Sequence, residues 1–245
     1  MASSDVPVYF EMSWSILSTI GLVNTFIGFM VIAITGLSGL SILPSIVSAA
    51  CALANGLCYY AYYTDCPKPA RMGASVVADI AWEIQEAGLS FYSYQMLNSL
   101  LRHKARITFL CLFWALMLVI LLLRVCILAF RAMDISTATN AMQGRIDHLH
   151  IGYFAAIAIV ESCSSFLLRI LLSAHHSSKI VFSRDGIWRQ LIRSTEIRLA
   201  TLCLVGILRA ITYSFQTDAQ MANSVTSQLD RFAYTLECLF PIVMM

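Results

Sequence analysis

Three acidic residues share one face of a predicted helix, in a stretch that otherwise has the composition of a membrane span. Asp79, Glu83 and Glu86 follow one another at intervals of four and three residues within the apolar segment from Gly73 to Leu101. Side chains at this spacing project from the same side of an α-helix. One ionised side chain at the centre of a bilayer costs roughly 2.5–3.5 kcal/mol. We therefore expect these three carboxyl groups to serve a function.

The chemistry that such a group could perform is proton donation. A carboxyl group removed from water favours its neutral form, and a second carboxyl nearby acts in the same direction. Glu83 would then be the general acid, and Asp79 and Glu86 would keep it protonated. Such a proton donor could act on an apolar substrate that enters from the lipid. No cofactor is expected for this reaction.

The composition of the chain indicates a multi-pass membrane protein. It is 59% hydrophobic and 12% charged, with a mean hydropathy of +0.75. Soluble domains are about 45–50% apolar and about 25% charged. A net charge of +2 provides no basic surface for nucleic acid, so the lipid bilayer and an apolar small molecule are the expected partners. We expect one integral membrane domain over residues 1–245.

The apolar segments predict an all-α transmembrane helical bundle of about seven helices, since one span requires about 20 residues. The candidate spans are 13–35, 40–62, 73–101, 107–130, 150–173, 198–216 and 230–245. The third carries the three acids and the last ends without a polar flank, so whether 73–101 and 230–245 cross fully is left open. Lys and Arg in the connections number seven on one side and five on the other, which predicts an outside N-terminus. The seven are Arg102, Lys104, Arg106, Lys179, Arg184, Arg189 and Arg193, and the five are Lys68, Arg71, Arg131, Arg145 and Arg231.

Further ionisable residues occur in the later predicted spans. Arg124, Glu161, Arg209 and Glu237 have mixed signs. Opposite charges on facing helices can form a structural network of ion pairs, and the same groups can form a working site. Both interpretations remain open from the sequence.

Two other residue classes have alternative interpretations. Aromatic side chains around the acids could line a cavity that stabilises a carbocation, or could form a membrane-interface belt. They are Trp82, Phe91, Tyr92, Tyr94 and Trp114. His148 and His150 lack the spacing of a metal site and are predicted to be loop histidines, so no metal is expected.

The segment Asp79-Ile-Ala-Trp-Glu83-Ile resembles the Ile-Ala-Trp-Glu segment of the small fungal membrane-bound terpene cyclases of meroterpenoid and indole-diterpene pathways. The resemblance implies acid-initiated cyclisation or epoxide opening of a polyene or prenylated substrate, in which Glu83 protonates an epoxide or alkene. The family's second proposed acid is an aspartate in the last helix, for which this chain offers only Glu237. The family glutamate also lies one helix earlier. The resemblance covers these few residues together with chain length and helix number.

A second resemblance is to fungal seven-helix membrane proteins of receptor-like or exporter-like type. Ser194-Thr-Glu-Ile-Arg198, which leads to Arg209 and Tyr213, carries it, together with a basic loop in the polar stretch from Ser173 to Arg198. It implies a non-enzymatic receptor-like or transporter-like protein, in which the acids bind a cation or relay protons. The expected location for either function is the endoplasmic reticulum or another secretory-pathway membrane.

Overall fold

The chain folds into seven helices, in a computed structural model that describes residues 13–101, 103–137, 142–177, 185–215 and 225–244. All regular secondary structure in these residues is helical, which confirms the predicted all-α fold class. The helices are α1 (Ser13–Thr35), α2 (Gly39–Tyr63), α3 (Lys68–Leu100), α4 (His103–Thr137), α5 (Gln143–Ser177), α6 (Asp185–Ser214) and α7 (Val225–Met244).

The short connection between α1 and α2 contains the residues that end one helix and begin the next. Gly36 has a φ of 83°, a left-handed conformation that glycine adopts without steric cost. Ser38 caps α2, because its hydroxyl oxygen accepts a hydrogen bond from the Ser41 backbone N–H. The Ser41 hydroxyl oxygen accepts one from the Ser38 N–H in return. This reciprocal capping box fixes the start of α2.

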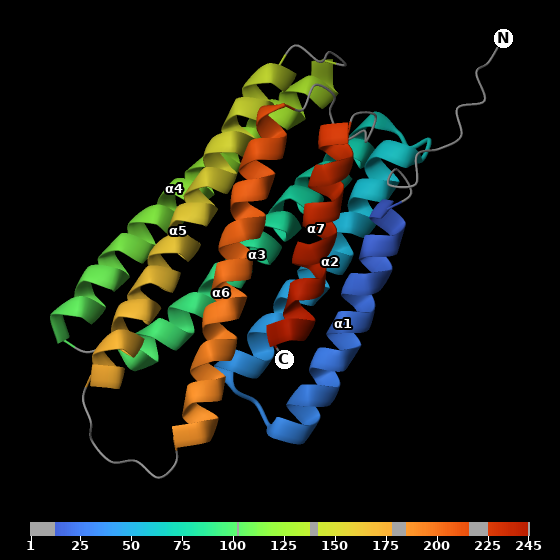
Figure 1. Ribbon diagram of the computed structural model, residues 1–245. Helices are drawn as coiled ribbons and strands as arrows, with labels where there is room; N and C mark the ends of the chain where they lie inside the picture. Colours follow the sequence, from blue (N-terminus) through green and yellow to red (C-terminus); the bar gives the residue numbers. More distant parts are fainter. Residues whose placement is uncertain (1–12, 102, 138–141, 178–184, 216–224, 245) are drawn as a thin grey trace.

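The helices form a closed bundle around α3. Each helix packs against the next along the chain, and α7 also contacts α1 and α2, which brings the two ends of the fold together. Figure 1 shows α3 crossing the bundle obliquely behind α6 and α7. Because α3 also contacts α4 and α5, its acidic face is turned toward the interior of the bundle.

Helices α1 and α2 approach each other closely at Gly21. A Cβ atom at Gly21 would lie 2.6 Å from the backbone nitrogen of Ala52 and 2.9 Å from its Cα. Small residues allow helix backbones in a membrane to approach this closely and to pack over a large contact area. Gly21 therefore sets the distance between these two helices.

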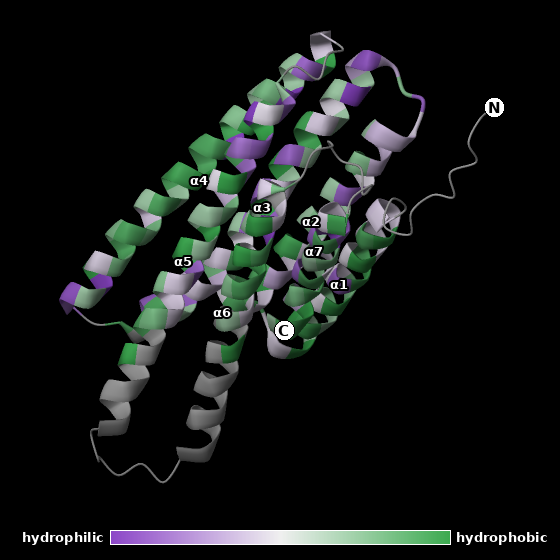
Figure 2. Cartoon of the chain, turned by 45° about the horizontal axis from the view of Figure 1, so that its top comes forward, coloured by the Kyte–Doolittle hydropathy of each residue, from purple (hydrophilic) through white to green (hydrophobic). Residues whose placement is uncertain are grey.

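The outer faces of the bundle are apolar. Phe26 and Met30 on α1 are more than half exposed, as are Leu118 and Leu122 on α4. Figure 2 shows continuous hydrophobic colouring along these two helices. An apolar surface of this extent would be unfavourable in water, whereas lipid chains solvate it without cost. The exposed surface is that of an integral membrane protein.

Four helices of the described chain are long and apolar enough to cross a membrane. They are α1, α2, α4 and the Gln143–Leu167 part of α5. The remaining three predicted spans correspond to α3, α6 and α7, which carry charged side chains within their apolar stretches. Those three helices contribute acids and arginines to the bundle interior, as described below.

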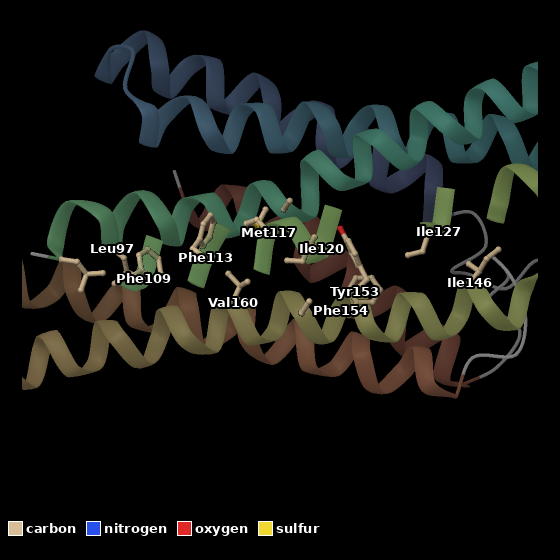
Figure 3. Close-up of a cluster of buried hydrophobic side chains, with 13 residues drawn as sticks. Leu97, Phe109, Phe113, Met117, Ile120, Ile127, Ile146, Tyr153, Phe154 and Val160 are labelled. Carbon is tan, nitrogen blue, oxygen red and sulfur yellow. The ribbon is translucent and has the colours of Figure 1, made fainter. Parts of the chain in front are cut away.

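A hydrophobic core holds α3, α4 and α5 together. Its largest fully buried members include Tyr153, Phe154, Phe113, Leu97 and Ile120, each at most 2% exposed. Figure 3 shows these side chains in a row between the three helices. Two members of this row contact ionisable side chains, since the Tyr153 hydroxyl bonds to Glu83 and the Phe154 ring lies against Arg209. Close packing of the row therefore helps to position them.

For the polar stretch from Ser173 to Arg198, the sequence predicts an intracellular loop with a short amphipathic piece. In the structure helices occupy both ends of this stretch, because α5 continues to Ser177 and α6 begins at Asp185. Polar residues with good helix propensity, such as Arg and Gln, extend a helix readily beyond its apolar part. The four basic side chains assigned to this loop, and the short resemblance motif that begins at Ser194, lie outside the described side chains.

Candidate functional site: a buried network of ionisable side chains

Eight charged side chains from α3, α4, α6 and α7 are buried together inside the bundle. Each is at most 8% exposed. They comprise four acids and four arginines: Asp79, Glu86, Asp230, Glu237, Arg124, Arg131, Arg209 and Arg231. Equal numbers of the two signs reduce the cost of burying any one of them. We call this set the buried charge network.

The first part of the network surrounds Asp79. Its carboxylate forms an ion pair with Arg131 of α4, and its Oδ1 lies 3.4 Å from Nη2 of Arg124. The Nε of Arg124 also donates a hydrogen bond of 3.2 Å to the backbone carbonyl of Asp79. Arg124 and Arg131 are seven residues apart, so they share one face of α4, opposite α3. This part of the network ties α3 to α4.

The second part surrounds Arg209 of α6. Its Nη1 donates to Oε1 of Glu86 and to Oε2 of Glu237, both at 2.7 Å. Its Nε lies 3.5 Å from Oδ1 of Asp230, and the Thr212 hydroxyl donates to the same Asp230 oxygen at 3.1 Å. Three carboxylates from α3 and α7 therefore share one guanidinium. Glu86 joins the two parts, because its Oε2 lies 3.8 Å from Nη1 of Arg124.

Glu83, the predicted proton donor, is placed differently from the other two acids of α3. Its side chain is half-buried, and its Oε2 accepts a hydrogen bond of 3.0 Å from the Tyr153 hydroxyl of α5. Glu83 forms no ion pair with any of the described residues. Asp79 and Glu86 instead form ion pairs with arginines, and the guanidinium of Arg124 contacts both of them.

Glu161 of α5 is a buried acid that forms no ion pair with any described residue. It is 1% exposed, and its Oε2 accepts a hydrogen bond of 2.7 Å from the Ser93 hydroxyl. An isolated ionised carboxylate is expensive in such surroundings, so a neutral carboxylic acid is the physical expectation. Ser90 lies on the same face of α3, one turn before Ser93, and lines the same region as Glu161.

Aromatic rings also contact the arginines of the buried charge network. The guanidinium of Arg231 lies 3.7 Å from the centre of the Trp14 ring, and that of Arg209 lies 3.9 Å from the centre of the Phe154 ring. Trp82 Nε1 donates to the Tyr234 hydroxyl at 2.7 Å. Cation–π contacts of this kind stabilise buried guanidinium groups without using their N–H donors.

Two small cavities, each of about 20 Å³, adjoin the network and share three lining residues, Glu86, Phe154 and Arg209. A cavity needs roughly 10–15 Å³ to hold one water molecule. The serine-side cavity is also lined by Ser90, Glu161 and Glu237, among others. The arginine-side cavity is lined by Trp14, Trp82, Glu86, Arg124, Arg131, His150, Phe154, Arg209, Arg231 and Tyr234.

The structure corrects several sequence interpretations. Arg131 and Arg231 were counted as loop residues, but they are buried within α4 and α7. His150 is not a loop histidine, because it lies buried within α5, and its Nδ1 lies 2.8 Å from the Ile146 carbonyl oxygen. In the sequence, the seven-residue spacing of Arg124 and Arg131 indicates that both lie on one face of a helix. Asp230 and Arg231 lie at the predicted edge of a span, where no spacing pattern marked them.

The aromatic side chains predicted to line one cavity do not lie together in the structure. Trp82 lies in the charge network and lines the arginine-side cavity. Phe91 and Tyr94 pack instead on Phe113 of α4, with ring centres 5.5 and 4.7 Å apart. Trp114 is 53% exposed on the outer face. Among the residues that the structure describes, no cluster of three or more His, Cys, Asp or Glu side chains could hold a metal ion.

The chain matches no family model, no curated protein and no solved structure. The two resemblances noted in the sequence therefore remain predictions, and the function has to be inferred from the site itself.

Proposed function

We propose that the protein is a transporter-like seven-helix membrane protein that conducts protons along its buried ionisable side chains. The observation that supports this function is a row of exchangeable groups along the interior. It begins at Arg131 and Asp79, passes through Arg124, Glu86 and Arg209, and ends at Glu161 with its serines. Intramembrane ionisable residues in such rows are typical of proton relays.

The length of the row agrees with this proposal. Asp79 and Ser93 are fourteen residues apart on α3, which corresponds to about 21 Å of helix at 1.5 Å per residue. The hydrocarbon core of a bilayer is about 30 Å thick. The length of the row along α3 is therefore about two thirds of that thickness, and the two cavities provide space for water between its members.

Proton movement along the row requires a group that can gain and lose a proton without breaking an ion pair. Glu161 is such a group, because a serine is its hydrogen-bond partner. The charge network supplies the neighbouring step, since Glu86 and Glu237 share one nitrogen of Arg209. A proton on one of these two carboxyls leaves the other paired with the guanidinium.

A flux assay in liposomes tests this function. Purified protein is reconstituted with an internal pH-sensitive dye, and a potassium diffusion potential drives protons inward. We expect acidification that Glu161→Gln lowers about tenfold or more, because an amide cannot carry the proton. Asp147→Asn is the matched control, since Asp147 lies on the same helix and bonds to Gln143, outside the row. Flux equal to that of protein-free liposomes would reject the proposal.

Acid-initiated cyclisation is the second candidate, and the placement of Glu83 supports it. This acid has no ion pair among the described residues and one hydrogen-bond donor, Tyr153. The cavities beside the network are far below the roughly 300–1,000 Å³ of small-molecule sites, so a polyene would reach Glu83 from the lipid side. Either function belongs in a secretory-pathway membrane, with the endoplasmic reticulum as the first choice.

Metabolite comparison distinguishes the second candidate from the first. Cells that express the intact protein or Glu83→Gln are extracted and analysed by mass spectrometry. A cyclic product that disappears in the variant, with accumulation of a linear or epoxide precursor, would favour the enzyme. Identical metabolites in both cell lines, together with proton flux that survives Glu83→Gln, would favour the relay.

A further inference from the structure

The arginine-side cavity is the meeting point of six helices. Side chains from α1, α3, α4, α5, α6 and α7 line it, and its volume is about 20 Å³. That volume is close to the space of one water molecule or one monatomic ion, and it is too small for a phosphate group or an organic acid. An occupant must therefore be small, and the chemistry of the wall decides its charge.

The wall of this cavity is cationic. Four guanidinium groups line it, from Arg124, Arg131, Arg209 and Arg231, against one carboxylate, Glu86. The other three acids of the buried charge network are not among the lining residues, and each forms an ion pair with one or more of these arginines. An occupant of the cavity is therefore nearer to positive than to negative charge.

The wall is also rich in hydrogen-bond donors. A guanidinium has five N–H donors and no acceptor. Nη2 of Arg124 is buried and makes no hydrogen bond with any described residue, and its nearest carboxylate oxygen is 3.4 Å away. The arginine side chain is 5% exposed, so bulk water does not satisfy this donor. A buried donor without a partner indicates a missing acceptor.

Aromatic rings hold the guanidinium groups in place around this space. Arg231 lies over Trp14, and Arg124 and Arg131 lie 5.7 and 5.8 Å from the centre of the Trp82 ring. These contacts are made by ring faces, so they do not use the N–H donors of the guanidinium groups. Trp14 and Trp82 therefore both stabilise the site and report on its occupancy.

We propose that this cavity binds one monovalent anion of halide size, held by the guanidinium groups of Arg124 and its three neighbours. The anion accepts hydrogen bonds from the wall, which includes Trp14 and Trp82, whose ring centres are 5.5 Å apart. This inference does not depend on proton conduction, because binding at equilibrium is measured without a membrane gradient.

Bromide quenching of tryptophan fluorescence tests the proposal. The chain has four tryptophans, so replacing Trp114 and Trp188 by Phe leaves only Trp14 and Trp82 as reporters. The full-length protein in detergent is titrated with bromide in gluconate at constant ionic strength. We expect a saturable quenching component that chloride displaces. Quenching that rises linearly with bromide, or that chloride leaves unchanged, would overturn the proposal and assign the cavity to water.

Variants of one arginine locate the binding site. Arg124→Gln should raise the apparent dissociation constant for bromide about tenfold or more, since a hydrogen bond to a charged group is lost. Arg106→Gln is the matched control, because Arg106 is exposed on the same helix and bonds to Asn98. Saturable quenching that is equal in both variants would contradict the assignment. If Arg124→Gln does not fold, the chloride competition in the parent protein still decides the outcome.

Discussion

Removal of the Arg209 guanidinium should destabilise the protein more than removal of any exposed charge. Two carboxylates lie 2.7 Å from its Nη1, and a third lies 3.5 Å from its Nε. In Arg209→Met, Glu237 and Asp230 would lose this partner, and Glu86 would keep only Arg124 at 3.8 Å. Breaking a buried ion pair by removing one partner costs about 3–5 kcal/mol.

The assay is thermal unfolding of the purified protein in detergent, followed by the loss of its monodisperse elution. For a chain of this length, 1 kcal/mol corresponds to about 2–4 °C, so the melting temperature should fall by roughly 6–20 °C. Adding Glu86→Gln and Glu237→Gln to Arg209→Met should recover at least half of the loss, because two of the three carboxylates that contact Arg209 are then replaced by neutral amides. The exposed Arg106→Met should change the free energy of unfolding by less than about 0.5 kcal/mol.

This reasoning fails in either of two cases. A melting temperature of Arg209→Met within 2 °C of the parent, roughly the effect of 1 kcal/mol, would mean that the three carboxylates do not depend on the guanidinium. A triple variant no more stable than the single variant would mean that lost packing of the arginine side chain, not its charge, causes the effect.

Two further perturbations test the packing around the site. Gly21→Ala should lower the free energy of unfolding by about 1–3 kcal/mol, since its Cβ would meet the Ala52 backbone. Gly73→Ala should raise it by about 0.5–1 kcal/mol, because no atom lies within 4 Å of the added Cβ. Equal melting temperatures of the two variants would contradict this expectation. Tyr234→Phe should lower the free energy of unfolding by about 2 kcal/mol, measured in the same way. The Tyr234 hydroxyl accepts a hydrogen bond from Trp82 and donates one to Gln85 at 3.1 Å, and the variant loses both. An unchanged melting temperature would argue that water replaces the hydroxyl.

The sequence alone predicted a helical membrane protein and identified one helix face as a candidate functional site. Composition and apolar segments predicted seven helices near their observed positions, because burial in lipid demands a long apolar run for each span. The intervals between Asp79, Glu83 and Glu86 identified a polar face on α3, since helix geometry is local. Glu161, Arg124, Arg209 and Glu237 were also visible as ionisable residues inside apolar stretches.

Only the tertiary structure decided which charges meet. Arg209 is 123 residues from Glu86 and 28 from Glu237 in the chain, and no local pattern relates them. The structure separates Glu83, bound to Tyr153, from Asp79 and Glu86, which are bound by arginines, although all three share one face of α3. Helix geometry fixes the direction of a side chain, whereas its partner depends on how the other helices pack around it.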